Sequence, residues 1–160
     1  MRQDIWYDSR GAGKIHGCRW LPAGEPKAVL QIVHGIAEFV ERYDDFANYL
    51  TGQGFLVVAE DHMGHGQSIN GEGIQGYFHG GWFSAVQDTY HLLEMTKQEY
   101  PDVPYILFGH SMGSFLALAF VSAQFINYFN YMYDCIACTE CVCGTEQRIH
   151  RSGRSLVIVK

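Results

Sequence analysis

The 160-residue sequence is poor in basic residues, in proline and in long hydrophobic runs. Lys and Arg number 11 against 17 Asp and Glu, and no basic cluster occurs, so a nucleic-acid partner is not expected. No apolar run is long enough to cross a membrane, and the N-terminus lacks the apolar segment of a secretory signal. Only one of the five cysteines, Cys18, lies in the first 121 residues, so no disulfide framework is expected there. These absences together predict a cytoplasmic protein without a transmembrane segment.

The most informative motif is Gly-His-Ser-Met-Gly at residues 109–113. An apolar, strand-like run precedes it at 105–108, and a helix-like segment follows it at 114–119. This context is typical of a nucleophile elbow, where a serine occupies a sharp turn and glycines let neighbouring segments approach closely. Ser111 is therefore predicted to be an exposed nucleophile at a helix N-terminus. The alternative is a small serine buried in a tight turn.

A second motif, His-Gly at residues 34–35, ends the apolar run 28–33. Acyl transfer places negative charge on a carbonyl oxygen, and each backbone N–H aimed at that oxygen lowers the barrier by on the order of 3 kcal/mol. Met112 follows the predicted nucleophile and would supply one such donor, while the loop after residue 33 would supply the other. For His34 itself we favour a hydrogen-bonded loop anchor over a proton shuttle.

Four motifs occur in order along the chain: HGIAE at 34–38, ERY at 41–43, DHMGHGQS at 61–68 and GHSMG at 109–113. Together they resemble the monoacylglycerol lipase and lysophospholipase branch of the α/β-hydrolases, also described as serine aminopeptidase-like (S33), over about residues 4–121. The resemblance implies that Ser111 accepts the acyl group and that the backbone N–H groups of Ile36 and Met112 form the oxyanion hole. It implies no metal and no organic cofactor. It also implies that Asp61 and His65 support the site and transfer no proton.

Alternating strand-like and helix-like segments predict an α/β fold with a mostly parallel sheet flanked by helices, the α/β-hydrolase fold. Strands are predicted near residues 4–9, 14–20, 28–33, 55–59 and 105–108. Two apolar stripes at helical spacing are interpreted as core-facing: Val40, Tyr43, Ala47 and Leu50, and Trp82, Val86, Tyr90 and Leu93.

A change in composition divides the chain near residue 121. Residues 1–121 have a net charge of −7 and are interpreted as the N-terminal half of an α/β-hydrolase domain, whereas residues 122–160 have a net charge of +1 and are rich in Cys and aromatics. No strand is predicted in this tail, and we expect a truncated fold with an out-of-frame or disordered end. Asp134 and His150 follow Ser111 in the order serine, acid, histidine, but a triad built from them is not favoured. Metal binding by the four tail cysteines is not favoured either.

Two functions remain open from the sequence. The first is a serine hydrolase that cleaves carboxylic esters of the monoacylglycerol or lysophospholipid kind through an acyl-enzyme on Ser111, with a small acyl ester or lipid-like molecule as substrate. The second is a catalytically inactive fragment of such a hydrolase, lacking the acid and the histidine of the triad. The oligomeric state is open in both cases.

Overall fold

The computed structural model describes residues 1–69, 73–127, 134–136 and 155–159, with side chains described up to residue 120. The strands are β1 (Arg2–Asp8), β2 (Lys14–Trp20), β3 (Ala28–Val33), β4 (Phe55–Glu60), β5 (Tyr105–Gly109), β6 (Asp134–Ile136) and β7 (Ser155–Val159). The helices are α1 (Asp44–Gly52), α2 (Gly81–Glu99) and α3 (Met112–Asn127), with short 3₁₀ turns η1 (Val40–Tyr43) and η2 (Gly66–Ser68). The five predicted strands and both predicted helices before residue 101 are present.

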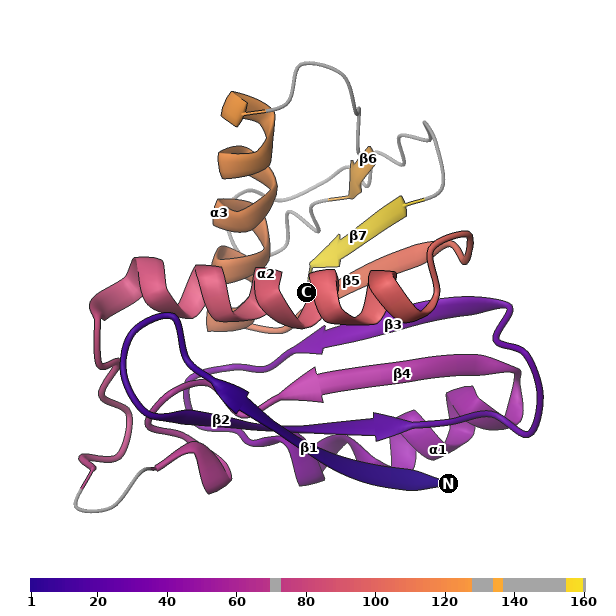
Figure 1. The fold of residues 1–160 in the computed structure, drawn as a ribbon, viewed down its shortest axis with the longest axis horizontal. Helices are drawn as coiled ribbons and strands as arrows, with labels where there is room; N and C mark the ends of the chain where they lie inside the picture. Colours follow the sequence, from indigo (N-terminus) through magenta and orange to yellow (C-terminus); the bar gives the residue numbers. More distant parts are fainter. Residues whose placement is uncertain (70–72, 128–133, 137–154, 160) are drawn as a thin grey trace.

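The described strands form one sheet in the order β1-β2-β4-β3-β5-β7-β6. β1 pairs with β2 and β2 with β4 in the antiparallel sense, whereas the four pairings from β4 to β6 are parallel. The carboxyl ends of β3, β4 and β5 therefore lie at one edge of the sheet (Figure 1), which brings the loops after them together. The predicted α/β fold with a mostly parallel sheet is confirmed.

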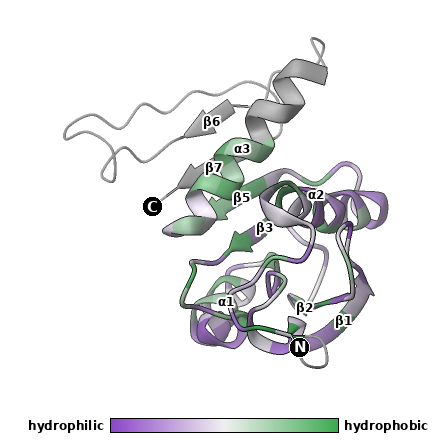
Figure 2. Cartoon of the chain, turned by 90° about the vertical axis from the view of Figure 1, so that its left-hand side faces the viewer, coloured by the Kyte–Doolittle hydropathy of each residue, from purple (hydrophilic) through white to green (hydrophobic). Residues whose placement is uncertain are grey.

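Helices cover both faces of the sheet (Figure 1). On the central strands, the side chains that point to one face of the sheet, such as Leu30 and Ile32, pack with Ala47 of α1. Val33 and Leu107 pack on the opposite face with α2 and α3. The described part of α3 is largely hydrophobic (Figure 2), as expected of a helix packed against both α2 and the sheet. None of the helices among the described residues is both long and apolar enough to span a membrane.

The core-facing stripe predicted for α2 is confirmed at Val86, which is buried, and at Tyr90 and Leu93, which pack against the same core. Trp82 is 37% exposed, whereas Ala85, Thr89 and Leu92 are buried. The buried side of α2 also carries Asp88, whose carboxylate accepts hydrogen bonds from the Ser9 hydroxyl and the Arg10 amide. The buried face is broader than the predicted stripe because polar side chains with partners can be buried at little net cost.

The expectation that no strand follows residue 121 is wrong for two short segments. β7 pairs in parallel with β5, from Tyr105 opposite Ser155 to Gly109 opposite Val159, and β6 pairs with β7. The sequence Ser-Leu-Val-Ile-Val of β7 is apolar and β-branched, which is the signal of a buried parallel strand. Of the remaining tail, His150 and the cysteines at 138, 141 and 143 lie outside the described residues.

A carboxyl group is buried beneath α2 at the end of β4. Glu60 is 1% exposed and accepts hydrogen bonds from the Tyr7 and Thr89 hydroxyls. Burial raises the pKa of Glu60 to about 7, against the lowering effect of these hydrogen bonds. Glu60 therefore holds its proton more strongly in the folded chain than in the unfolded one, where its pKa is about 4.5.

Replacing Glu60 by Gln should stabilise the chain relative to wild type as the pH rises. The wild type loses stability between about pH 4.5 and 7 because the buried carboxyl must then ionise, and Gln has no such cost. From pH 5 to pH 8 the difference in free energy of unfolding should shift by about 2 kcal/mol in favour of E60Q. Urea unfolding at both pH values measures this difference, and the titration of groups that do not interact with Glu60 cancels between the two proteins. A difference in free energy of unfolding that is the same at pH 5 and pH 8 would contradict the assignment.

Candidate active site

Ser111 lies in a strained turn between β5 and α3. Its φ of 53° is in the left-handed region, and it is the one non-glycine residue with positive φ among the described residues. Ser111 is exposed, and within the described part of the chain no group hydrogen-bonds its hydroxyl. Such backbone strain costs on the order of 1–3 kcal/mol and persists only where the surroundings impose it. The geometry is that of a nucleophile elbow.

Two glycines allow this turn to form. A Cβ at Gly109 would lie 2.6 Å from the carbonyl oxygen of Gly113. A Cβ at Gly113 would overlap the carbonyl oxygen of Val33 and lie 2.6 Å from that of His34. The start of α3 thus packs directly against the backbone at the end of β3, which a larger residue would prevent.

The loop after β3 lies against the elbow. A Cβ at Gly35 would be 3.1 Å from the Cβ of Ser111, and the His110 amide donates to the Val33 carbonyl at 3.0 Å. The N–H groups of Ile36 and Met112 have no acceptor among the described residues, which is also true of Ala37 and Ser111, whereas those of Gly35 and Gly113 donate within their own turns. The two predicted oxyanion donors are therefore free, one in each of the two loops that meet at Ser111.

A carboxylate joins these two loops. Glu38 Oε2 accepts hydrogen bonds from the Gly35 amide at 2.8 Å, from the Tyr43 hydroxyl at 2.7 Å and from His110 Nδ1 at 2.8 Å. Burial raises the pKa of Glu38, but these three hydrogen bonds outweigh it and lower the pKa to about 2. Glu38 is thus an anion that holds the loop after β3 to His110, the residue before Ser111. The sequence analysis gave Glu38 no role, although Glu38, Tyr43 and His110 each belong to one of the four motifs.

Three buried histidines, His34, His62 and His65, lie against the loop that follows β3. His34 Nδ1 donates to the Gly35 carbonyl, and its Nε2 accepts from the His62 amide, so both ring nitrogens are in use. Burial, reinforced by the neighbouring His62, lowers the pKa of His34 and keeps the ring neutral. His65 Nε2 donates to the Ile36 carbonyl at 2.8 Å. His34 is therefore a loop anchor, as predicted, and His65 holds the peptide group that follows Ile36.

Asp61 has a structural role in the same region. Its carboxylate accepts from His16 Nδ1 and from the amides of Val40 and Gln67. Gly66 must be glycine because its φ is 47° and a Cβ would overlap the Asp61 carboxylate. Asp61 is fully buried by these contacts, which agrees with the expectation that it supports the site.

No hydrogen bond joins the Ser111 hydroxyl to a histidine in the described part of the chain. The ring nitrogens of His34 and His65 are bonded to backbone groups, and His110 Nδ1 is bonded to Glu38. Burial lowers the pKa of His62 to about 4, and its Nε2 contacts the His34 carbonyl. The side chain of Asp134 and all of His150 lie outside the described residues.

Comparisons with known proteins agree with this geometry. Residues 24–129 match the family model described as Hydrolase_4, serine aminopeptidase, S33. Mouse monoglyceride lipase is 37% identical over 131 residues, which are 81% of this chain and 42% of the mouse protein. Human monoglyceride lipase is 37% identical over 117 residues, 72% of this chain and 37% of the human protein. The chain thus spans about two fifths of the length of these curated relatives.

Two solved structures resemble the chain in the same way. A lipase in its open form has a TM-score of 0.72 and 30% identity, over 86% of this chain and 43% of its own. A carboxyl esterase from Bacillus coagulans in complex with glycerol has a TM-score of 0.71 and 30% identity, over 77% of this chain and 40% of its own. With a family model that matches well over half of the residues, this chain belongs to the serine aminopeptidase, S33 family of α/β-hydrolases.

Proposed function

We propose that this chain carries the nucleophile and the oxyanion hole of a serine hydrolase that cleaves carboxylic esters. The observation that supports this most directly is the elbow at Ser111, with its φ of 53° and its exposed hydroxyl at the start of α3. In the proposed reaction the Ser111 oxygen attacks the ester carbonyl, the alcohol leaves, and water later releases the acid from the acyl-enzyme. No metal or organic cofactor takes part.

The backbone N–H groups of Ile36 and Met112 are proposed to stabilise the oxyanion. Both lack an acceptor among the described residues, and each belongs to a loop that is held in place by Glu38 or by the glycine contacts. Donors fixed before the substrate arrives need no reorganisation when charge develops, which is why such groups are effective.

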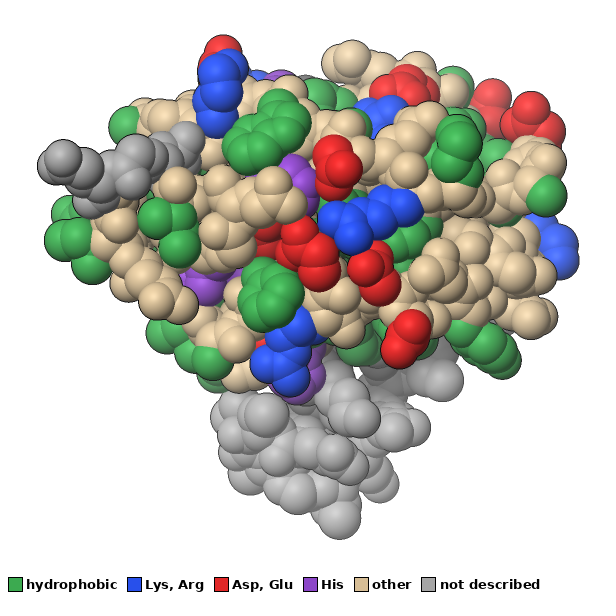
Figure 3. Space-filling view, turned by 90° about the horizontal axis from the view of Figure 1, so that it is seen from below, with side chains coloured by type: hydrophobic (Ala, Val, Ile, Leu, Met, Phe, Trp, Pro, Cys, Tyr) green, Lys and Arg blue, Asp and Glu red, His purple; other side chains and the backbone are tan. Residues whose placement is uncertain are grey.

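The proposed substrate is a monoacylglycerol- or lysophospholipid-like ester. Both curated relatives are monoglyceride lipases by name. The residues next to the proposed site also suit an acyl chain, because Ile36 is 61% exposed and Phe115, in the first turn of α3, is 52% exposed. Basic side chains are scattered singly over the face seen in Figure 3, which gives no continuous surface for a nucleic acid. We propose a cytoplasmic location.

A serine hydroxyl needs a base to become nucleophilic at neutral pH. No hydrogen bond joins a described histidine to the Ser111 hydroxyl, and we infer that the histidine and its acid lie outside the described residues or on another chain. This chain therefore works as an enzyme only if a histidine base lies within hydrogen-bond distance of the Ser111 hydroxyl. The alternative function, a catalytically inactive hydrolase fragment, follows if no such base does.

A fluorophosphonate probe separates the two functions because it reports serine activation without assuming a substrate. We expect stoichiometric labelling of the purified, folded chain by intact mass, with complete loss in S111A. The matched control S114A removes a hydroxyl three residues along, which donates to the Ser111 carbonyl, and should still be labelled. If the folded wild type takes up no probe, the proposal of an active enzyme fails and the inactive alternative holds.

A further inference from the structure

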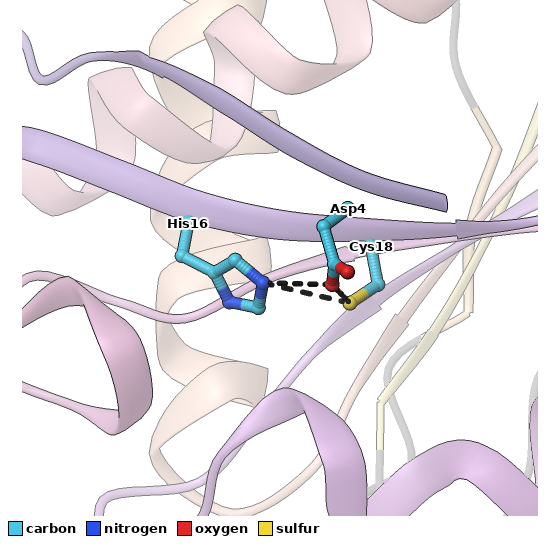
Figure 4. Close-up of side chains that lie close together, drawn as sticks. All are labelled: Asp4, His16 and Cys18. Carbon is cyan, nitrogen blue, oxygen red and sulfur yellow. Dashed lines mark hydrogen bonds and ion pairs between the residues drawn. The ribbon is translucent and has the colours of Figure 1, made fainter. Parts of the chain in front are cut away.

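Three side chains of types that bind metals in other proteins lie together on β1 and β2 (Figure 4). The antiparallel register places Asp4 directly opposite Cys18. His16 precedes Cys18 by two residues, so the alternation of a strand puts both on the same face. Asp4 is 12 residues from His16, and only the pairing of the two strands brings the carboxylate, the imidazole and the thiol together.

The three ligand atoms are spaced as a tetrahedral metal requires. Asp4 Oδ1 lies 3.0 Å from His16 Nε2 and 3.2 Å from Cys18 Sγ, and the Sγ lies 3.8 Å from that Nε2. Bond lengths of about 2.0–2.3 Å from zinc to nitrogen, oxygen and sulfur give ligand-to-ligand distances of about 3.4–3.6 Å at tetrahedral angles. Each observed distance is within about 0.4 Å of that range. A zinc ion could therefore be held with only small movements of the side chains.

His16 is oriented by a second carboxylate. Its Nδ1 lies 2.8 Å from Asp61 Oδ2, and both side chains are fully buried. Asp61 is itself fixed by the amides of Val40 and Gln67. This arrangement, a carboxylate that accepts from one ring nitrogen while the other faces the ligand position, is the usual support of a metal-binding histidine. It keeps Nε2 directed at Asp4 and Cys18.

The surroundings suit a divalent cation with one open position. His16 and Cys18 are buried, whereas the Asp4 side chain is 56% exposed, so water can reach the cluster from the Asp4 side. The nearest cation, Arg2, contacts Asp4 at 3.3 Å. Arg2 has further partners in Glu41 at 3.4 Å and Asp44 at 3.0 Å, so it can release Asp4 without losing its other ion pairs.

We propose that Asp4, His16 and Cys18 form a zinc-binding site with water as the fourth ligand. Cys18 binds as the thiolate and His16 through Nε2, so the Sγ proton and the Nε2 proton, which both face the Asp4 carboxylate, are released to solvent. The ion would fasten β1, the edge strand of the sheet, to β2. The site acts on stability and takes no part in the chemistry at Ser111.

The test uses the full chain with Cys135, Cys138, Cys141 and Cys143 replaced by serine, because the tail cysteines could bind metal by themselves. Titration with Co²⁺ should give one equivalent bound, with a thiolate-to-cobalt charge-transfer band that Zn²⁺ abolishes by displacement. C18S should lose the band, and H16Q should weaken binding by about 100-fold.

The D4N variant tests the site without disturbing the core, because the Asp4 side chain is 56% exposed. It should bind about 10-fold more weakly, whereas D8N, at an exposed acid on the same strand, should bind as the parent does. At the same concentration, Zn²⁺ should raise the Tm of the parent and of D8N by more than that of D4N. A parent without the cobalt band, or a band that persists in C18S, would overturn the site.

Discussion

A methyl group added at Gly113 should cost about 3 kcal/mol or more of the free energy of unfolding. The Cβ of Ala would overlap the Val33 carbonyl oxygen and lie 2.6 Å from that of His34. Both neighbours are backbone atoms of β3 and the loop after it, so no side chain can move aside. The chain can accommodate the methyl only by separating α3 from the sheet, and overpacking of that kind is among the costliest single changes.

Thermal or urea unfolding measures this effect. For a chain of this size the expected loss corresponds to a fall in Tm of about 10 °C. The matched control is Gly52→Ala at the end of α1, where a Cβ would meet nothing within 4 Å. That substitution should leave the stability unchanged or raise it by less than about 1 kcal/mol, since Ala restricts the unfolded chain. Similar Tm values for G113A and G52A would contradict the close approach of α3 to β3.

Removal of the Glu38 carboxylate should loosen the oxyanion loop. In Glu38→Ala the Gly35 amide, the Tyr43 hydroxyl and His110 lose their common acceptor. A hydrogen bond to a charged group contributes about 1.5–3 kcal/mol to stability. Glu38 accepts three, and because they share one oxygen their contributions do not simply add. We expect hydrogen exchange at the Gly35 amide to become at least about 10-fold faster, and the fluorophosphonate labelling of Ser111 to slow by about 10- to 100-fold.

Two further variants separate positioning from general destabilisation. Glu38→Gln keeps an acceptor oxygen without the charge, and should restore part of the exchange protection and of the labelling rate. Glu41→Ala removes a carboxylate three residues away that contacts Arg2 and Gln67, and should change neither measurement. The exchange measurement does not depend on a general base. If hydrogen exchange at the Gly35 amide is unchanged in E38A, Glu38 does not hold this loop in place, and that result stands even if the chain takes up no probe.

The pattern of residues was sufficient for the elements around Ser111. Runs such as residues 28–33 and 105–108 are apolar and short and end at Gly-containing turns, and each became a strand of the parallel sheet. The elbow was predictable for the same reason, because a serine between glycines after such a run has few other conformations. The two strands and the turn at Ser111 depend on residues that are close together in the sequence, so the sequence alone was enough to predict them.

Contacts between distant residues were not predictable in this way. The face that α2 buries includes Asp88 and Thr89, whose partners Ser9 and Glu60 are 79 and 29 residues away. The role of Glu38 depends on His110, 72 residues later. A polar side chain is inexpensive to bury only when its partner is in place, and hydropathy carries no information about that partner.

The sequence by itself therefore determined the α/β class, the positions of the strands before residue 110 along the chain and the elbow that exposes Ser111, because periodicity and glycine placement act over short distances. The tertiary structure decided which polar groups meet. It placed Glu38 between the oxyanion loop and the elbow, it added β7 beside β5, and it set Asp4 opposite Cys18. Each of these depends on strand register and packing between segments far apart in the chain, which only the folded sheet fixes.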